Sequence, residues 1–321
     1  MLIALLKIIG GLLLLVHGAD QFVTGASHTA RKLGVSPLII GLTVVGVSTS
    51  LPEVLVGVVA ALDGKTSIAI GNALGSNIAN IGLVLGGTAV VIPLAVSSRT
   101  LRREFLLMCI AMLIALALML DDYLGRRDGV ILLLSLAAIL AWIVIMAKRS
   151  PRTDPLAREY AREFKAGTAV WPSLLQILFG LAVLLAGAQI LVDGAVFVAR
   201  SFGISDLIIG LTVIAVGTSL PELAASIASA VKREPEIALG NVIGSNMFNM
   251  LMVLGVPALI HPSGYGAEVV RRDFPVMLAL TAVMGVVVFV HRRGRFRRRE
   301  GVVLLACFIA YQAWLFLAAT S

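Results

Sequence analysis

The sequence carries little charge and few aromatic residues for its length. Only 14% of the 321 residues are Asp, Glu, Lys or Arg, whereas 59% are hydrophobic and 6% are aromatic. A soluble domain of this size is covered by a polar shell, and so few charged residues cannot build one. The mean hydropathy of +1.00 points the same way. The composition therefore excludes a soluble globular protein and indicates an integral membrane protein.

Cysteine and histidine are also scarce, with two and four residues. Both cysteines, Cys109 and Cys307, lie within apolar runs, where we expect small buried apolar side chains. Neither residue type occurs in the repeated motifs described below. Because Zn²⁺ and Cu⁺ prefer imidazole and thiolate ligands, the motifs do not suit these metals.

Long apolar runs recur along the whole chain. About 20 apolar residues in a helix cross the roughly 30 Å of hydrocarbon in a bilayer. We therefore expect an all-α integral membrane protein with ten transmembrane helices, near residues 2–30, 36–61, 67–95, 104–120, 128–147, 172–199, 205–231, 236–260, 274–290 and 301–319. The first run is too long for a cleaved signal peptide and lacks a basic leading segment.

The net charge of +8 would suggest a nucleic-acid partner in a soluble protein, but its distribution argues otherwise. With ten spans, 19 of the 26 Lys and Arg residues fall on one side of the membrane and seven on the other. The richer side is expected to be cytoplasmic, which places both termini outside the cytoplasm. The basic excess is therefore a topology signal, and we expect a lipid bilayer and no nucleic acid as the partner.

A stretch of 47 residues occurs twice. Residues 41–87 align without a gap to residues 210–256, at a constant offset of 169 with 22 identities. The polar segment 148–171 separates a first repeat of five expected helices, residues 1–147, from a second, residues 172–321. Because five is odd, the second repeat enters the membrane from the opposite side. The sequence therefore predicts two inverted five-helix repeats joined by a cytoplasmic linker.

Each copy of the repeat places one glutamate in an otherwise apolar segment, Glu53 in GVSTSLPE and Glu222 in AVGTSLPE. An ionisable residue inside a membrane is costly and by default marks an ion or proton pathway. Two such residues at matching positions of an internal repeat indicate a transporter whose site lies where the halves meet.

The residues around each glutamate favour a polar site in a broken helix. Pro52 has no N–H, so the carbonyl of Ser48 loses its helical partner, and Pro221 has the same effect on Gly217. A simple proline kink is the alternative interpretation. The spacing of the hydroxyls favours a polar site over a simple kink, because the hydroxyl residues one turn before each glutamate flank the helix face that carries it. They are Thr49 and Ser50 in the first repeat and Thr218 and Ser219 in the second.

A second motif follows in the third span of each repeat, GNALGSNIAN at 71–80 and GNVIGSNMFN at 240–249. Its hydroxyl and amide residues are four apart and can project toward one point: Ser76 with Asn80, and Ser245 with Asn249. Close packing of helices through small residues is the alternative, chiefly for the glycines.

Two carboxylates with hydroxyls, amides and freed carbonyls make an all-oxygen site. Such a site suits hard cations, namely Ca²⁺, Na⁺, Mg²⁺ or Mn²⁺. Because Mg²⁺ resists losing its waters, a site of broken helices fits Ca²⁺ or Na⁺ better.

The paired GTSLPE-type and GNxxGSN motifs resemble the two repeats of the sodium/calcium exchangers, within the calcium/cation antiporter superfamily and closest to its compact prokaryotic members. The resemblance covers essentially the whole chain. It implies that Glu53 and Glu222 are the central carboxylates and that Ser50, Ser219, Ser76 and Ser245 are hydroxyl ligands. It further implies backbone carbonyls from Thr49, Thr218, Gly46 and Ala215, and an amide from Asn80. Asn249 stands where many members have an aspartate, which leaves the counter-ions open.

The expected function is a secondary antiporter, not an enzyme, that exchanges Ca²⁺ for Na⁺ across the cytoplasmic membrane, with no resident cofactor and as a monomer. H⁺ and K⁺ remain alternative counter-ions. A channel is disfavoured because the chain has one inverted pair and no repeated filter. An intramembrane enzyme is disfavoured because no HExxH or GxSxG motif is present in the repeats.

Overall fold

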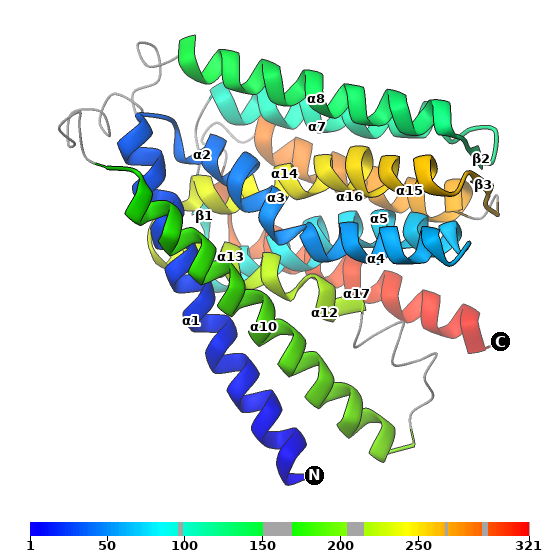
Figure 1. Cartoon of the computed structure of the whole chain (residues 1–321), viewed down its shortest axis with the longest axis horizontal. Coiled ribbons are helices and arrows are strands. Elements are labelled where there is room, and N and C mark those ends of the chain that lie inside the picture. The colour runs from blue at the N-terminus through cyan, green and yellow to red at the C-terminus, as the bar shows by residue number, and fades with distance from the viewer. Residues whose placement is uncertain (96–98, 150–168, 204–214, 267–268, 291–294, 321) are drawn as a thin grey trace.

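The computed structural model describes residues 1–95, 99–149, 169–203, 215–266, 269–290 and 295–320, and these are almost entirely helical. The expected linker 148–171 lies largely outside the described residues, and so does the start of the expected span 205–231. Figure 1 shows a bundle of roughly aligned helices with one long helix pair leaning away from it.

The leaning pair consists of α1 (Leu2–Leu33) and α10 (Trp171–Ser201). The two helices run antiparallel and touch through glycines along most of their length. A Cβ atom added at Gly18 would lie 2.3 Å from the backbone N of Leu184, and one at Gly187 would lie 2.5 Å from that of Leu15. Only glycine permits such an approach of two backbones, so the pair is tightly joined.

These contacts are mirrored between the two halves. Gly18 and Gly187 are 169 residues apart, and so are their contact partners Leu15 and Leu184. A contact between repeat-related residues also occurs in the bundle. Asn77 Nδ2 donates a hydrogen bond at 3.3 Å to the backbone carbonyl of Asn246, which lies 169 residues further along the chain. Residues at the repeat offset thus make equivalent contacts across the molecule.

The first half continues through a broken helix and a long bent one. The broken helix comprises α2 (Pro37–Ile40), the π-helix η1 (Gly41–Val45), α3 (Gly46–Thr49) and α4 (Leu51–Leu62). The bent helix comprises α5 (Thr66–Ala79), the π-helix η2 (Asn80–Leu85) and α6 (Gly86–Val91). Then follow α7 (Arg99–Leu118) and α8 (Arg126–Arg149).

The described part of the second half follows the same order. After α10 come α12 (Ala215–Thr218) and α13 (Leu220–Val231), and then α14 (Pro235–Phe248), the π-helix η4 (Asn249–Val253) and α15 (Gly255–Ile260). The π-helix η5 (Val269–Asp273), α16 (Phe274–Val290) and α17 (Arg298–Thr320) end the chain.

Two short antiparallel strand pairs tie loops together at opposite ends of the bundle. Strand β1 (Leu94–Ala95) pairs with β4 (Arg295–Phe296), and β2 (Tyr123–Leu124) pairs with β3 (Ser263–Gly264). We call the end of the bundle where α1 ends and α10 and α14 begin the linker end. The opposite end, where α1 begins and α4 and α10 end, is the terminal end (Figure 1).

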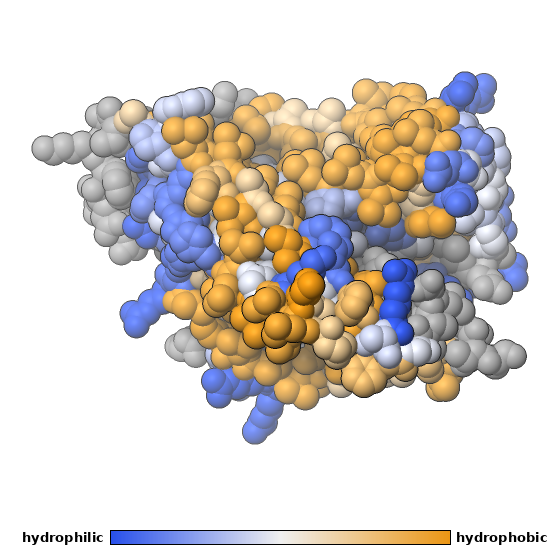
Figure 2. Space-filling view, turned by 60° about the horizontal axis from the view of Figure 1, so that its bottom comes forward, coloured by the Kyte–Doolittle hydropathy of each residue, from blue (hydrophilic) through white to orange (hydrophobic). Residues whose placement is uncertain are grey.

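The core of the bundle is formed around α5 and α14, which are the most deeply buried of the long helices. The outer helices expose large apolar side chains instead. Figure 2 shows the result as a hydrophobic band with hydrophilic residues gathered at its two ends. This is the surface that a membrane-spanning bundle presents to lipid.

In the described residues, seven helices are long and apolar enough to cross a membrane, or eight if the pair Pro37–Thr49 and Leu51–Leu62 is one bent span. Of the ten expected spans, 104–120 corresponds to α7, whose Arg102, Arg103 and Glu104 reduce its apolar length. The span 205–231 is described only from Ala215. One expectation is wrong: Cys307 is exposed, because α17 lies on the outside of the bundle, and Cys109 is only half-buried.

Candidate functional site

Both motif glutamates are buried in the first turn of the helix that follows a break. Helix α3 ends at Thr49 and α4 begins at Leu51, with a bend of 40° between them. Ser50, at the break, has φ −84° and ψ 4°, and its counterpart Ser219 has φ −92° and ψ 2°. Pro52 and Pro221 lie in the first turn after each break, as expected for a residue that cannot continue the preceding ladder.

Glu53 and Glu222 are each 1% exposed, and they lie near each other although they come from the two halves of the chain. In the described structure, both carboxylate oxygens of Glu222 and Oε2 of Glu53 have no hydrogen-bond partner. Buried carboxylates without partners are costly, so oxygens left in this way need a cation or a proton.

The third-span residues lie on segments that pack against the helices of the glutamates, η2 against α13 and η4 against α4. Ser76, Asn80, Ser245 and Asn249 are all buried, and Asn80 and Asn249 each begin a π-helix, η2 and η4. A π-helix widens the helical turn and often occurs at functional sites. The amide oxygen and nitrogen of Asn249 have no hydrogen-bond partner in the described residues. The hydroxyls of Ser50 and Ser219 are likewise unpaired there.

The remaining expected ligands are placed differently. Gly46 is buried in α3, and its carbonyl accepts a hydrogen bond from Ser245 Oγ at 3.3 Å. Thr218 is half-buried in α12. Ala215 begins α12, and only its backbone is described. Ala215 is therefore the one expected site residue whose side chain lies outside the described part of the chain.

Two asparagines that the sequence did not predict, Asn72 and Asn241 of the GN pairs, hold the backbone of the glutamates. Asn72 Nδ2 donates to the backbone carbonyl of Glu53 at 3.3 Å, and Asn241 Nδ2 donates to that of Glu222 at 3.2 Å. The signal was available, since both belong to the repeated motif at the offset of 169. Each amide fixes the backbone that carries a glutamate.

Asn241 also joins the two halves. Its Oδ1 accepts a hydrogen bond from Thr49 Oγ1 at 3.1 Å, and its Nδ2 also donates to Ser226 Oγ at 3.0 Å. Asn241 is fully buried, whereas its counterpart Asn72 is only half-buried. Because α14 starts at the linker end and α5 at the terminal end, the site is more tightly enclosed toward the linker end.

Toward the terminal end the site meets a cavity of about 1010 Å³. The cavity lies between the α1–α10 pair and the broken helices, and its lining includes Pro52, Thr218 and Pro221 of the motifs. Met1, Lys7 and Arg200 line it as well. Figure 2 shows hydrophilic atoms in a hollow of the hydrophobic band. The cavity therefore reaches the motif residues beside the two helix breaks, while Glu53 and Glu222 themselves stay buried behind them.

Among the described residues, no group of three or more His, Cys, Asp and Glu side chains is placed to hold a metal. An ion at this site would therefore depend on two carboxylates together with neutral oxygens. Neutral hydroxyl, amide and carbonyl oxygens are ordinary ligands of Ca²⁺ and Na⁺. The donor set fits a hard cation as cargo.

Comparison with known proteins now decides the family. A family model described as "Sodium/calcium exchanger protein" matches residues 3–147 and 172–317. The chain belongs to the sodium/calcium exchanger family. It is 47% identical over 317 residues to the CaxA protein of Alkalimonas amylolytica, covering 98% of this chain and 99% of the other.

Two further comparisons, one of sequence and one of structure, support the same family and fold. The chain is 30% identical to the sodium/calcium exchanger MaX1 of Methanosarcina acetivorans, covering 95% of this chain and 96% of the other. The solved structure of the sodium/calcium exchanger from Methanococcus jannaschii superposes with a TM-score of 0.83 at 33% identity, covering 97% of this chain and 98% of that one. The chain is thus a multi-span helical membrane protein of an ion-exchanger family.

Proposed function

We propose that this chain is a secondary antiporter that exchanges Ca²⁺ for Na⁺ across the cytoplasmic membrane, normally exporting Ca²⁺. The observation that carries the proposal is the pair of buried glutamates, Glu53 and Glu222, beside two helix breaks. Three of their four carboxylate oxygens lack a hydrogen-bond partner in the described residues. Membership of the sodium/calcium exchanger family supports cation antiport, and the site chemistry supports Ca²⁺ as one cargo.

The site would bind its ions by charge neutralisation. Two ionised carboxylates carry a charge of about −2, which one Ca²⁺ balances and which Na⁺ ions or protons also balance. If these ions compete for the same carboxylates, the loaded states alternate. An empty pair of buried carboxylates is costly, so movement without cargo is disfavoured and the fluxes stay coupled.

The proposed ligands are Glu53 and Glu222 together with the hydroxyls of Ser50, Ser219, Ser76 and Ser245 and the amides of Asn80 and Asn249. Backbone carbonyls of Thr49, Thr218, Gly46 and Ala215 complete the set. The burial of the described side chains and the unpaired atoms of Ser50, Ser219 and Asn249 support this assignment.

We further propose ten spanning helices in two inverted repeats, 1–147 and 172–321, with the linker end cytoplasmic and both termini outside. The mirrored contacts of Gly18 and Gly187 on antiparallel helices support a two-fold axis in the membrane plane. The two family-matched segments support the division of the chain. The excess of Lys and Arg supports the orientation.

A second counter-ion stays open at Asn249. The family resemblance implies an aspartate there, and the amide of this chain leaves two ionisable groups, Glu53 and Glu222. H⁺ or K⁺ would then replace Na⁺ wholly or in part. The test is uptake of ⁴⁵Ca²⁺ into proteoliposomes driven by an outward gradient of Na⁺, of H⁺ or of K⁺. The proposal expects Na⁺ to drive uptake, and uptake driven only by H⁺ or K⁺ would overturn the choice of counter-ion.

A further inference from the structure

One face of α1 is tied to the bundle at the linker end by ionic contacts. Asp20, Ser27 and Arg31 are spaced by seven and four residues and so share a helix face. Asp20 Oδ1 lies 2.6 Å from Lys232 Nζ. Glu234 Oε1 accepts hydrogen bonds from Ser27 Oγ at 2.7 Å and from Arg31 Nη2 at 2.8 Å. All three contacts reach a single turn of the bundle.

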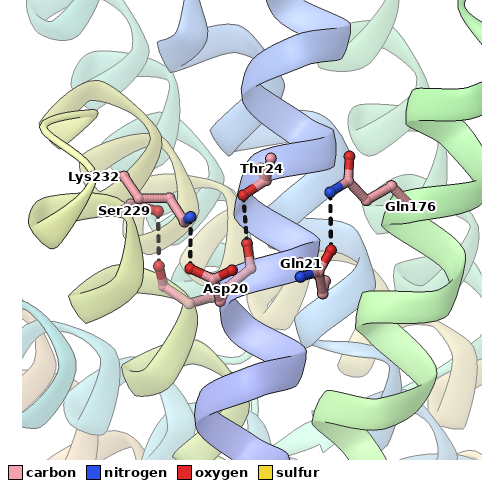
Figure 3. Close-up of polar contacts among 7 residues, drawn as sticks. Asp20, Gln21, Thr24, Gln176, Ser229 and Lys232 are labelled. Atoms are coloured by element: carbon pink, nitrogen blue, oxygen red, sulfur yellow. Dashed lines mark hydrogen bonds and ion pairs between the residues drawn. The ribbon is translucent and has the colours of Figure 1, made fainter.

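That turn, residues 232–234, connects α13 to α14. Glu234 precedes the first turn of α14 and is 5% exposed, so its contacts with Ser27 and Arg31 are shielded from solvent. Helix α10 is held at the same level, because Gln176 Nε2 donates to Gln21 Oε1 at 2.9 Å. Figure 3 shows Lys232 reaching Asp20 on one side of α1 and Gln176 meeting Gln21 on the other. The α1–α10 pair is therefore attached to the bundle here as one body.

The terminal end holds the counterpart of this arrangement. Subtracting 169 from the turn gives residues 63–65, and the backbone matches, since Gly64 has φ 72° and Arg233 has φ 62°. Adding 169 to the face of α1 gives Gln189, Val196 and Arg200 on α10. All three of these α10 residues line the cavity. The face that is tied at the linker end is thus parted from the bundle at the terminal end.

The charges of the two arrangements do not match. Where Asp20 meets Lys232, the counterparts are Gln189 and Asp63, a neutral amide and a carboxylate. Where Ser27 meets Glu234, the counterparts are Val196 and Lys65, which make no hydrogen bond. Where Arg31 meets Glu234, the counterparts are Arg200 and Lys65, which carry like charges. Closing the terminal end would lose the linker-end attractions and gain a repulsion.

We propose that Asp20, Ser27, Arg31, Lys232 and Glu234 form a linker-end latch, and that the missing counterpart makes the conformation open at the terminal end the resting state of this chain. The inference rests on the proposed function, because two alternating conformations are what an antiporter requires. The latch sets the balance between the two states and takes no part in holding the ion.

Distances across the cavity mouth test the latch. Ile3 on α1 and Leu55 on α4 both line the cavity and are exposed, so cysteines there accept spin labels once Cys109 and Cys307 are replaced by alanine. Double electron–electron resonance in lipid nanodiscs, with Na⁺ or Ca²⁺ in excess, then measures the distances between the two labels. Short distances correspond to the closed conformation and long distances to the open one, so their populations give the closed-to-open ratio. The latch predicts mostly long distances in the otherwise unchanged chain.

Breaking the latch should raise the closed fraction. Asp20→Asn should raise the closed-to-open ratio about two- to five-fold, as for a partly exposed ion pair. Glu234→Gln should raise it about tenfold, because a shielded charge with two donors is lost. The double exchange Asp20→Lys with Lys232→Asp should restore the original ratio. Arg103→Gln breaks the Arg103–Glu104 ion pair elsewhere and is the matched control, with no change expected.

A variant that adds a contact at the terminal end tests the latch without weakening any contact of the folded protein. Lys65→Glu places a carboxylate at the counterpart of Glu234, opposite in charge to Arg200 at the counterpart of Arg31, and should also raise the closed fraction. An unchanged ratio in Asp20→Asn and Lys65→Glu would overturn the latch. Calcium flux by the same proteins separates the two proposals. If the distances respond to the substitutions but the protein moves no Ca²⁺, the antiporter is rejected and the latch is retained. If the distances do not respond but the protein exchanges Ca²⁺, the latch is rejected and the antiporter is retained.

Discussion

Two carboxyl groups define the chemistry of this molecule at the scale of residues. Glu53 and Glu222 are buried and come from positions 169 apart, and three of their four carboxylate oxygens lack a hydrogen-bond partner in the described residues. The expected ligands around them supply only neutral oxygens. The backbone carbonyls of the two glutamates are held by Asn72 and Asn241. The site is therefore built twice from one motif.

Glu53→Gln and Glu222→Gln should each lower Ca²⁺ affinity about tenfold to a hundredfold, because each removes one charge-assisted ligand at nearly constant shape. Isothermal titration calorimetry of the purified protein measures the change. Glu104→Gln is the control, since Glu104 is equally buried but pairs with Arg103 outside the site. Normal affinity in either glutamine variant would contradict the site assignment.

Asn241→Ala should impair the protein more than Asn72→Ala. Asn241 is fully buried and bonds to Glu222, Ser226 and Thr49, so its loss leaves several groups unsatisfied, at about 1–3 kcal/mol each. Asn72 is half-buried, and its one described hydrogen bond goes to Glu53. Thermal unfolding and Ca²⁺ flux of the two variants make the comparison, and equal effects would argue against a bridging role for Asn241.

At the scale of elements, irregular helices place the polar residues. The breaks at Ser50 and Ser219 expose backbone near the glutamates, and the π-helices η2 and η4 begin at Asn80 and Asn249. Irregular backbone is tolerated at membrane depth only where protein or a polar cavity receives it. The close α1–α10 pair, in contrast, is regular and moves as one body in the latch proposal.

Pro52→Ala should restore an N–H donor and let α3 and α4 form one straighter helix. The 40° bend would decrease, and the carbonyls freed by Pro52 would accept helical hydrogen bonds again. Ca²⁺ affinity should then fall at least about tenfold, while thermal stability stays the same or rises. Pro172→Ala is the control, because Pro172 starts α10 away from the site. Unchanged affinity in Pro52→Ala would show that the break is not needed for binding.

Gly18→Ala should destabilise the protein by about 1–3 kcal/mol, because its new methyl group would meet the backbone of Leu184 at 2.3 Å. Gly10→Ala, on the same helix with no described atom within 4 Å of its added Cβ, should be neutral. Unfolding midpoints in detergent compare them. Equal midpoints would mean that α1 and α10 are not packed as closely as described.

At the scale of the whole molecule, the sequence predicted the parts that depend on local pattern. The repeat and the helix breaks beside Pro52 and Pro221 follow from residue type and spacing. Asn72 and Asn241 were not predicted, and the ligand set stays a prediction. The family match agrees with the resemblance drawn from the motifs. The contacts of Asp20 with Lys232 and of Arg31 with Glu234 could not be predicted, because they join residues over 200 positions apart and have no equivalent in the other repeat. They depend on how α1 packs against one particular turn.

Competition between ions at equilibrium tests the central claim most directly. Binding of ⁴⁵Ca²⁺ to the purified protein is measured at increasing Na⁺ concentrations, with choline keeping the ionic strength constant. If Ca²⁺ and Na⁺ share the carboxylates of Glu53 and Glu222, the apparent Kd for Ca²⁺ should rise steadily with Na⁺ while the number of sites stays constant. A Kd for Ca²⁺ that is independent of Na⁺, with both ions bound at once, would contradict the shared site.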